Sequence, residues 1–210
     1  AKLKEDFPHV HIENCSGGGG RVDMGLMSYY ETNWTSDNTN PFQRLFIQEG
    51  FTHAYAPKIM SAWVTDSGNF DLKYRFHSSM MGIMGIGANI LKWTEEEKKV
   101  ARKMVEKYKK IRSVVQFGDL YRVRSPREGK TTVVEYVSKD KEEAYVFVFK
   151  NYSDLDGDII KVPVRGLDPQ IHYSAHGFTG LATGKALMDQ GLTISLTGAH
   201  KSVLLEIKKT

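Results

Sequence analysis

The sequence predicts an α/β region followed by an all-β region. Over residues 1–116, short apolar runs alternate with segments of helical periodicity, which is typical of repeated strand–loop–helix units. Over residues 117–210, short runs of β-branched and aromatic residues recur between turn residues, which is typical of an antiparallel β-sandwich. We therefore expect two domains, with the boundary between residues 116 and 117.

The first two strands are expected near the start of the chain. Residues 7–15 alternate apolar and polar side chains and predict a short strand. The glycines at 17–20 then allow a sharp turn, because glycine adopts positive φ at little cost. Residues 21–29 predict a short helix, and residues 32–36 predict a second strand that ends at Asp37.

Two further units complete the α/β region. A helix is expected to begin at residues 40–41, Asn-Pro, because proline is tolerated in the first turn of a helix. The apolar runs at 55–64 and 80–90 do not alternate, as expected of strands covered on both faces. Thr94 and Glu97 form a capping box, and the apolar spacing behind them predicts an amphipathic helix of about five turns.

Eight short β runs are expected in the all-β region. They occupy residues 120–123, 131–137, 144–149, 158–164, 171–175, 185–188, 192–196 and 202–207. Turn residues separate them at regular intervals, which favours antiparallel neighbours over parallel ones.

Composition limits the class of protein. With 210 residues, of which 40% are hydrophobic, the chain can bury a core, and it has no apolar run long enough to predict a membrane span. The single Cys15 excludes an internal disulfide and favours a reducing compartment, the cytoplasm. The net charge is +4, and the lysines are spread along one helix and the tail, so no nucleic-acid partner is expected.

No metal site is expected. Residues 154–158, Asp-Leu-Asp-Gly-Asp, resemble a calcium loop, but Ile159 and Arg165 stand where an EF-hand needs its Gly and Glu. The histidines form no His-x-x-x-His pair on a predicted helix.

Three features could carry chemistry but also have ordinary structural explanations. Asp37 precedes a helix, where aspartate is a common N-cap. Cys15 follows a strand, and such cysteines are often buried core residues. The glycines at 17–20 could form a linker or a phosphate loop, but Arg21 follows them in place of the Gly-Lys-Ser/Thr of a phosphate loop.

Three ordered motifs resemble one known family. They are Cys-Ser-Gly-Gly-Gly-Gly-Arg-Val-Asp at 15–23, Trp-Thr-Ser-Asp-Asn-Thr at 34–39 and Arg-Leu-x-Ile-Gln-x-Gly at 44–50. Together they are similar to the second half of the barrel in family 36 glycoside hydrolases, the retaining α-galactosidases and α-N-acetylgalactosaminidases. The resemblance implies the second half of a (β/α)8 barrel, with four β/α units, followed by an antiparallel β-sandwich.

The resemblance also implies roles for residues at the strand ends. Asp37 matches the general acid/base, which protonates the departing glycosidic oxygen and then activates water. Cys15 and Gly18 match positions that line the sugar pocket near its 2-position. Trp34 matches a platform for the C–H face of the sugar.

Further matched positions are expected to support the site. Arg21 and Asp23 are expected to form a buried ion pair that holds the glycine loop. Glu13 is the other carboxylate on the first strand, and it is the best substitute within this sequence for a nucleophile. Trp63 departs from the family, which often has Gly-Ala-His where residues 61–63 read Ser-Ala-Trp, so the details of the substrate stay open.

The family nucleophile is an aspartate in a Lys-Trp-Asp-x-Asn-Arg motif, which this sequence lacks. Four β/α units also cannot close an eight-stranded barrel. The resemblance therefore implies a C-terminal fragment whose partner is the missing N-terminal half of the enzyme. Because a half-barrel exposes strand edges and apolar surface, a homo-oligomer is also expected.

The expected function is hydrolysis of terminal α-linked galactose by a retaining exo-glycosidase. No cofactor is expected, because two carboxylates suffice for this chemistry. An α-linked N-acetylgalactosaminide is the alternative substrate. A non-catalytic carbohydrate-binding chain is the alternative from another class of function.

Overall fold

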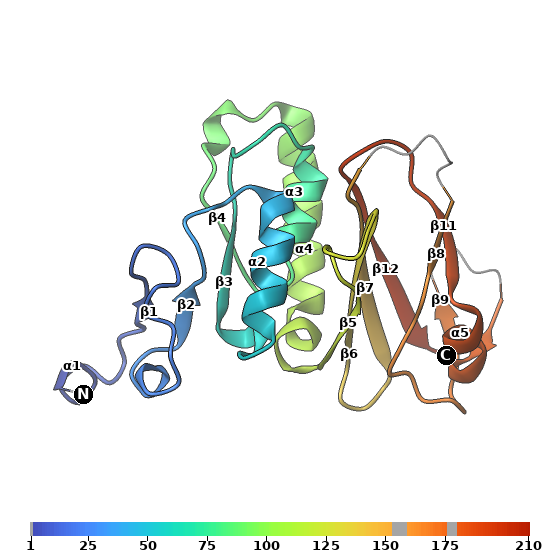
Figure 1. Cartoon of the computed structure of the whole chain (residues 1–210), viewed down its shortest axis with the longest axis horizontal. Coiled ribbons are helices and arrows are strands. Elements are labelled where there is room, and N and C mark those ends of the chain that lie inside the picture. Colours follow the sequence, from blue (N-terminus) through green and yellow to red (C-terminus); the bar gives the residue numbers. More distant parts are fainter. Residues whose placement is uncertain (1, 153–158, 176–179) are drawn as a thin grey trace.

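The structure is a computed structural model that describes residues 2–152, 159–175 and 180–210 (Figure 1). The elements form successive layers along the long axis of the molecule. A four-stranded sheet is followed by helices, then by a six-stranded sheet, and finally by a two-stranded sheet with a short helix. The segment at 154–158 that resembles a calcium loop lies outside the described residues.

The first sheet is parallel, with strand order β1-β2-β3-β4. Its strands are β1 (Glu13–Asn14), β2 (Thr32–Trp34), β3 (Met60–Val64) and β4 (Ile83–Ile86). The helices of this region are α1 (Lys2–Asp6), α2 (Pro41–Thr52), α3 (Leu72–Ser79) and α4 (Glu95–Phe117), with 3₁₀ turns η1 (Leu26–Ser28), η2 (Pro57–Ile59) and η3 (Ile90–Lys92). Four parallel strands with helices on one side confirm the predicted α/β region.

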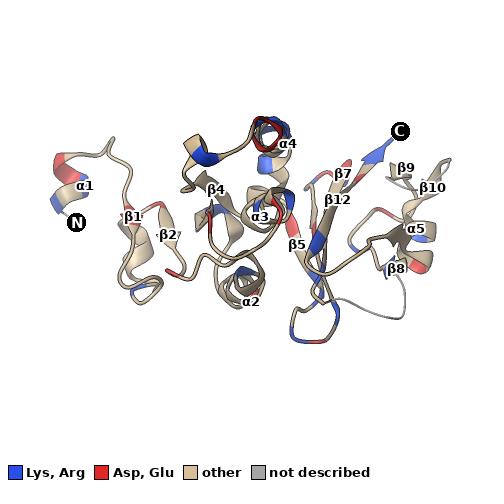
Figure 2. Cartoon of the chain, turned by 90° about the horizontal axis from the view of Figure 1, so that it is seen from above, with Lys and Arg blue, Asp and Glu red and all other residues tan. Residues whose placement is uncertain are grey.

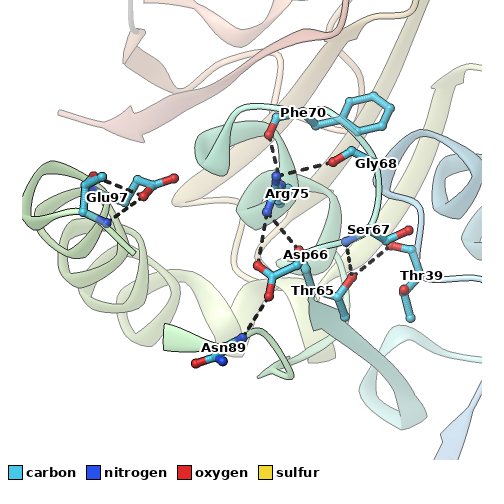
Figure 3. Close-up of polar contacts among 10 residues, drawn as sticks. Thr39, Thr65, Asp66, Ser67, Gly68, Phe70, Arg75, Asn89 and Glu97 are labelled. Atoms are coloured by element: carbon cyan, nitrogen blue, oxygen red, sulfur yellow. Dashed lines mark hydrogen bonds and ion pairs between the residues drawn. The ribbon is translucent and has the colours of Figure 1, made fainter. Parts of the chain in front are cut away.

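Two helix starts predicted from local signals are confirmed. The Asn40 side chain accepts hydrogen bonds from the backbone N–H groups of Phe42 and Gln43, so Asn40 is the N-cap of α2. The capping box of α4 is complete: Glu97 N–H donates to Thr94 Oγ1 at 3.2 Å, and Thr94 N–H donates to Glu97 Oε2 at 2.8 Å (Figure 3). Because Asn40 caps α2, the explanation of Asp37 as a helix cap is wrong.

Two predicted elements are wrong. Residues 21–29 form turns around η1 in place of a helix, because Asp23 Oδ1 accepts the N–H of Leu26 and holds the backbone in a turn. Residues 185–188 lie in helix α5 (Gly184–Gln190), where a strand was expected. The Thr183 hydroxyl caps this helix by accepting the Ala186 N–H, and Gly191, with φ of 70°, ends it.

The second region is an antiparallel sheet domain. Its six-stranded sheet has the order β10-β9-β12-β7-β6-β5, and β11 pairs with β8 in a separate two-stranded sheet. The strands are β5 (Asp119–Arg124), β6 (Thr131–Val137), β7 (Glu143–Lys150), β8 (Ile159–Val162), β9 (His172–Ala175), β10 (Ala182–Thr183), β11 (Leu192–Ser195) and β12 (Lys201–Lys209). Seven of the eight predicted β runs therefore contain strands.

The six-stranded sheet is covered on both faces. From β7, Tyr145, Phe147 and Phe149 pack in a core that includes residues of α3 and α4. The alternating residues Val146 and Val148 pack in a second core with residues of β8, β11 and α5. One sheet thus serves as the wall of two hydrophobic cores, because strand side chains point alternately to opposite faces.

Buried hydrogen bonds join the sheet domain to the half-barrel, and one of them links α3 to β12. His77 Nδ1 lies 2.9 Å from the Ser202 hydroxyl, and burial lowers the pKa of His77 to about 3, so this imidazole is neutral at physiological pH. Between the same two regions, the Tyr136 hydroxyl on β6 donates to the Met81 carbonyl at 2.8 Å. These contacts fasten the sheet domain to the half-barrel.

Charge is mixed on the outer surface. Figure 2 shows acidic and basic residues side by side on α4, where Lys98 pairs with Glu95 at 2.8 Å and Lys99 pairs with Glu96 at 2.6 Å. Exposed pairs of this kind contribute little to stability, and they keep the helix solvated. Among the described residues, no helix has both the length and the apolar composition that crossing a membrane requires.

Candidate active site

The carboxyl ends of the parallel strands bring the matched residues together, since these ends meet at one edge of the sheet. Cys15 follows β1 and is exposed, so its explanation as a buried core residue is wrong. Thr35, Ser36 and Asp37 follow β2, and the glycine turn packs directly against their backbone.

The glycine turn is an ordered contact and not a linker. Gly18 has φ of 78°, and a Cβ added there would lie 2.9 Å from Ser36 Cα and 3.0 Å from the Asp37 nitrogen. A Cβ on Gly19 would lie 2.6 Å from the Thr35 carbonyl oxygen. Glycine is therefore needed because the backbone of the turn touches the backbone that carries Asp37.

Replacing Gly18 with alanine should destabilise the chain by about 1–3 kcal/mol more than replacing Gly17 with alanine. Both glycines have positive φ, 78° and 51°, so the backbone strain is similar, but a Cβ on Gly17 meets nothing within 4 Å. Urea unfolding of both variants measures the difference. Equal losses would contradict the close packing of the turn on the Asp37 segment.

Asp37 is exposed, and one hydrogen bond orients its carboxylate. The indole N–H of Trp34 donates to Asp37 Oδ1 at 2.9 Å. Trp34 itself is only 7% exposed, because the Arg44 guanidinium lies 5.2 Å from its ring centroid and the Trp63 ring lies 4.6 Å away. The expectation that Trp34 offers a sugar platform is thus corrected: its ring is covered, and its N–H positions Asp37.

Arg44 is a site residue to which the sequence motif gave no role. It is 3% exposed and donates to the carbonyls of Ser36 at 3.2 Å and Ser61 at 2.8 Å. Burial lowers the pKa of Arg44 to about 10, so it remains a cation, and none of the described carboxylates pairs with it. Arg44 ties the segment before Asp37 to β3 and supports the Trp34 ring from α2.

Of the residues expected to support the site, Glu13 contacts neighbouring strands, whereas Arg21 and Asp23 do not pair. Glu13 accepts hydrogen bonds from the Ser61 hydroxyl on β3 and from Thr32 Oγ1, at 3.4 Å, on β2. Its carboxylate therefore links three strands on the inner face of the half-barrel. Arg21 and Asp23 are both exposed, and the described part of the chain holds no ion pair between them, so the predicted buried pair is wrong.

A second polar cluster fixes the loops that follow β3 and β4 (Figure 3). Arg75 donates to the carbonyls of Phe70 at 3.0 Å and Thr65 at 3.2 Å, and it pairs with Asp66 at 3.5 Å. Asp66 Oδ2 in turn accepts the N–H of Asn89, at 2.9 Å, from the loop after β4. These contacts tie together two loops on the same edge as Asp37.

This architecture defines a class of protein. A parallel half-barrel that presents an exposed carboxylate at a strand end, with an antiparallel sheet domain behind its helices, is typical of a barrel-type glycoside hydrolase. The chain belongs to the Melibiase family, which it matches over residues 1–118, and residues 131–207 match the glycosyl hydrolase family 36 C-terminal domain.

Several relatives are similar in sequence to the chain. Alpha-galactosidase AgaA of Geobacillus stearothermophilus is 38% identical over 199 residues, which are 92% of this chain and 27% of AgaA. Alpha-galactosidase 1 of Pediococcus pentosaceus is 33% identical over 196 residues, 90% of this chain and 27% of the relative. The chain thus spans about a quarter of the length of these relatives.

Solved structures agree over the whole chain. The crystal structure of GH36 alpha-galactosidase AgaB from Geobacillus stearothermophilus superposes with a TM-score of 0.94 at 35% identity. A variant of AgaA in complex with raffinose gives a TM-score of 0.95 at 34% identity. Each comparison covers 100% of this chain and 30% of the solved chain.

Proposed function

We propose that this chain is the C-terminal part of a retaining exo-glycosidase that hydrolyses terminal α-linked galactose, with Asp37 as general acid/base. The observation that carries the proposal is the placement of Asp37. It is an exposed carboxylate at the end of β2, oriented by Trp34 and backed by a buried Arg44, in a chain similar to alpha-galactosidases. Relatives crystallised with raffinose and stachyose support a galactoside as substrate.

Asp37 would act twice in this reaction. As an acid it protonates the departing glycosidic oxygen, and as a base it deprotonates the water that opens the glycosyl-enzyme intermediate. A retaining enzyme needs its nucleophilic carboxylate about 5–5.5 Å from the acid/base. Glu13 is engaged by Ser61 and Thr32, which supports a nucleophile from protein outside these 210 residues.

The partner of the chain would be the other half of the barrel. We assign residues 1–116 to the half-barrel and residues 117–210 to the sheet domain. β1 and β4 are the edge strands of the four-stranded sheet, and each has an unpaired side where a further parallel strand can add. A homo-oligomer remains part of the proposal on the same ground.

An α-linked N-acetylgalactosaminide is the second candidate substrate. Gly18 presents no side chain and Cys15 is a small exposed residue at the matched sugar-pocket positions. Together they leave room for a hydroxyl or for a larger N-acetyl group.

The test joins these 210 residues to the part of AgaA that precedes its matching region. The product should hydrolyse nitrophenyl α-galactoside faster than nitrophenyl α-N-acetylgalactosaminide, and proton NMR should show α-galactose as the first product. The chain alone should turn over neither substrate. A folded but inactive assembly favours a non-catalytic carbohydrate-binding chain, and a β-configured first product contradicts the retaining mechanism.

A further inference from the structure

Trp63 is the exposed aromatic residue on the inner face of the half-barrel. It is 43% exposed, whereas the other tryptophans, Trp34 and Trp93, are 7% and 8% exposed. Trp63 lies two residues after Ser61 on β3, so both side chains point to the same face of the sheet. Ser61 contacts Glu13 across that face, which places Trp63 inside the half-barrel, one residue before β3 ends.

Two glycines on the neighbouring strand make room for this indole. Gly85 is opposite Trp63 in the β3–β4 register. A Cβ on Gly85 would lie 2.7 Å from Trp63 Cδ1, and a Cβ on Gly87 would lie 3.0 Å from Cε3, at the other end of the indole. The ring therefore lies along the end of β4, on backbone that carries no side chain.

Trp63 also covers the ring that was expected to bind sugar. Its centroid lies 4.6 Å from that of Trp34, with 42° between the two planes. The indole N–H of Trp34 is committed to Asp37 at 2.9 Å. The aromatic surface that stays open beside Asp37 is consequently the surface of Trp63 and not that of Trp34.

We propose that Trp63 is the apolar platform against which the C–H face of the galactosyl ring packs, and that it thereby sets the affinity of the site for that ring. The inference rests on the proposed function. An indole presents a large apolar face at low entropic cost, and the C–H face of a pyranose is its complement.

The kinetic test uses the assembled enzyme described above. Trp63→His should raise both KM for nitrophenyl α-galactoside and the inhibition constant of free galactose by about 3- to 10-fold, with kcat changed little. Trp63→Phe keeps an aromatic face and should change both constants by less than about 3-fold. Trp93→Phe is the matched control, because Trp93 is buried against Phe76, and it should leave the inhibition constant of galactose unchanged.

A second measurement needs no activity. Because Trp63 is the exposed one of three tryptophans, acrylamide quenching of the 210-residue chain reports mainly on its indole. Galactose should protect the fluorescence from quenching, and the Trp63→Phe variant should lose most of the quenchable signal.

The two tests separate the possible failures. An assembled enzyme without any activity contradicts the proposed function, and protection by galactose in the isolated chain would still support the platform. An active enzyme whose galactose inhibition constant is the same with Trp63→His overturns the platform. Trp63 is then a barrel-core residue that the other half of the barrel covers.

Discussion

Replacing Asp37 with alanine should lower the hydrolysis of raffinose by the assembled enzyme by about 10²–10⁴-fold. Raffinose has a poor leaving group, so loss of the proton donor slows formation of the galactosyl-enzyme intermediate. Nitrophenolate leaves without protonation, so with that substrate the intermediate should form quickly and then accumulate, because no base activates water. Added azide needs no base and should restore turnover, giving α-galactosyl azide as product.

Asp189→Ala is the matched control for this prediction. Asp189 is an exposed aspartate on α5 that pairs with Lys185 at 2.8 Å, in the sheet domain and away from the strand ends that carry Asp37. Its removal should change neither substrate's turnover. A loss at Asp37 that is equal for raffinose and the nitrophenyl substrate, with no response to azide, would contradict the acid/base role.

Replacing Glu135 with glutamine should remove a large pH dependence of stability. Glu135 is 0% exposed on β6; its Oε2 accepts the Arg165 N–H at 2.7 Å, and Oε1 has no partner among the described residues. Burial raises the pKa of Glu135 to about 8 from 4.5. Between these values the folded chain holds a proton that the unfolded chain releases, so stability falls as pH rises.

The expected loss of stability follows from the pH range between the two pKa values of Glu135. The free energy of unfolding should fall by about 1.4 kcal/mol per pH unit, or about 3–5 kcal/mol in total, and should level off above pH 8. Urea unfolding at pH 5, 6.5, 8 and 9 should show the Glu135→Gln variant losing much less stability across this range. Glu142→Gln, at an exposed residue paired with Lys209, should follow the unsubstituted chain. Parallel curves for Glu135→Gln and the unsubstituted chain would contradict a protonated core glutamate.

The sequence predicts those parts of the fold that depend on local signals. The capping box at Thr94 and Glu97 and the Asn-Pro start at residues 40–41 fix helix ends through neighbouring residues alone, and both are confirmed. The runs at 131–137 and 144–149 are rich in β-branched and aromatic residues, which favour strands, and both are strands in the structure.

Weak or conflicting local signals explain why one helix was not predicted and why one short helix was predicted as a strand. Leu72–Ser79 is a helix capped by Asp71, but its alternation of apolar and polar residues resembles a strand and hides the helix. Residues 185–188 are too few to separate strand from helix by periodicity.

The sequence predicts which residues belong to the candidate site, but it does not predict the contacts between them. That Cys15, Gly18 and Asp37 belong together follows from the resemblance, because parallel strands end at one edge. The covering of Trp34 depends on Trp63 and Arg44, which come from β3 and α2, and no local pattern encodes such contacts. The same holds for Arg21 and Asp23, which match the family and were expected to form a buried pair that the turn geometry does not form.

The six-stranded sheet that separates the two cores has a consequence for the order in which parts of the chain fold during translation. β12 lies between β7 and β9 in the six-stranded sheet, contacts α3, and supplies Ser202 as the partner of His77. It is translated after every element that it touches, several seconds behind α4 at about 5–20 residues per second. Until residues 201–209 leave the ribosome, the inner face of α3 lacks part of its cover, so α3 completes its packing only after β12 has been made.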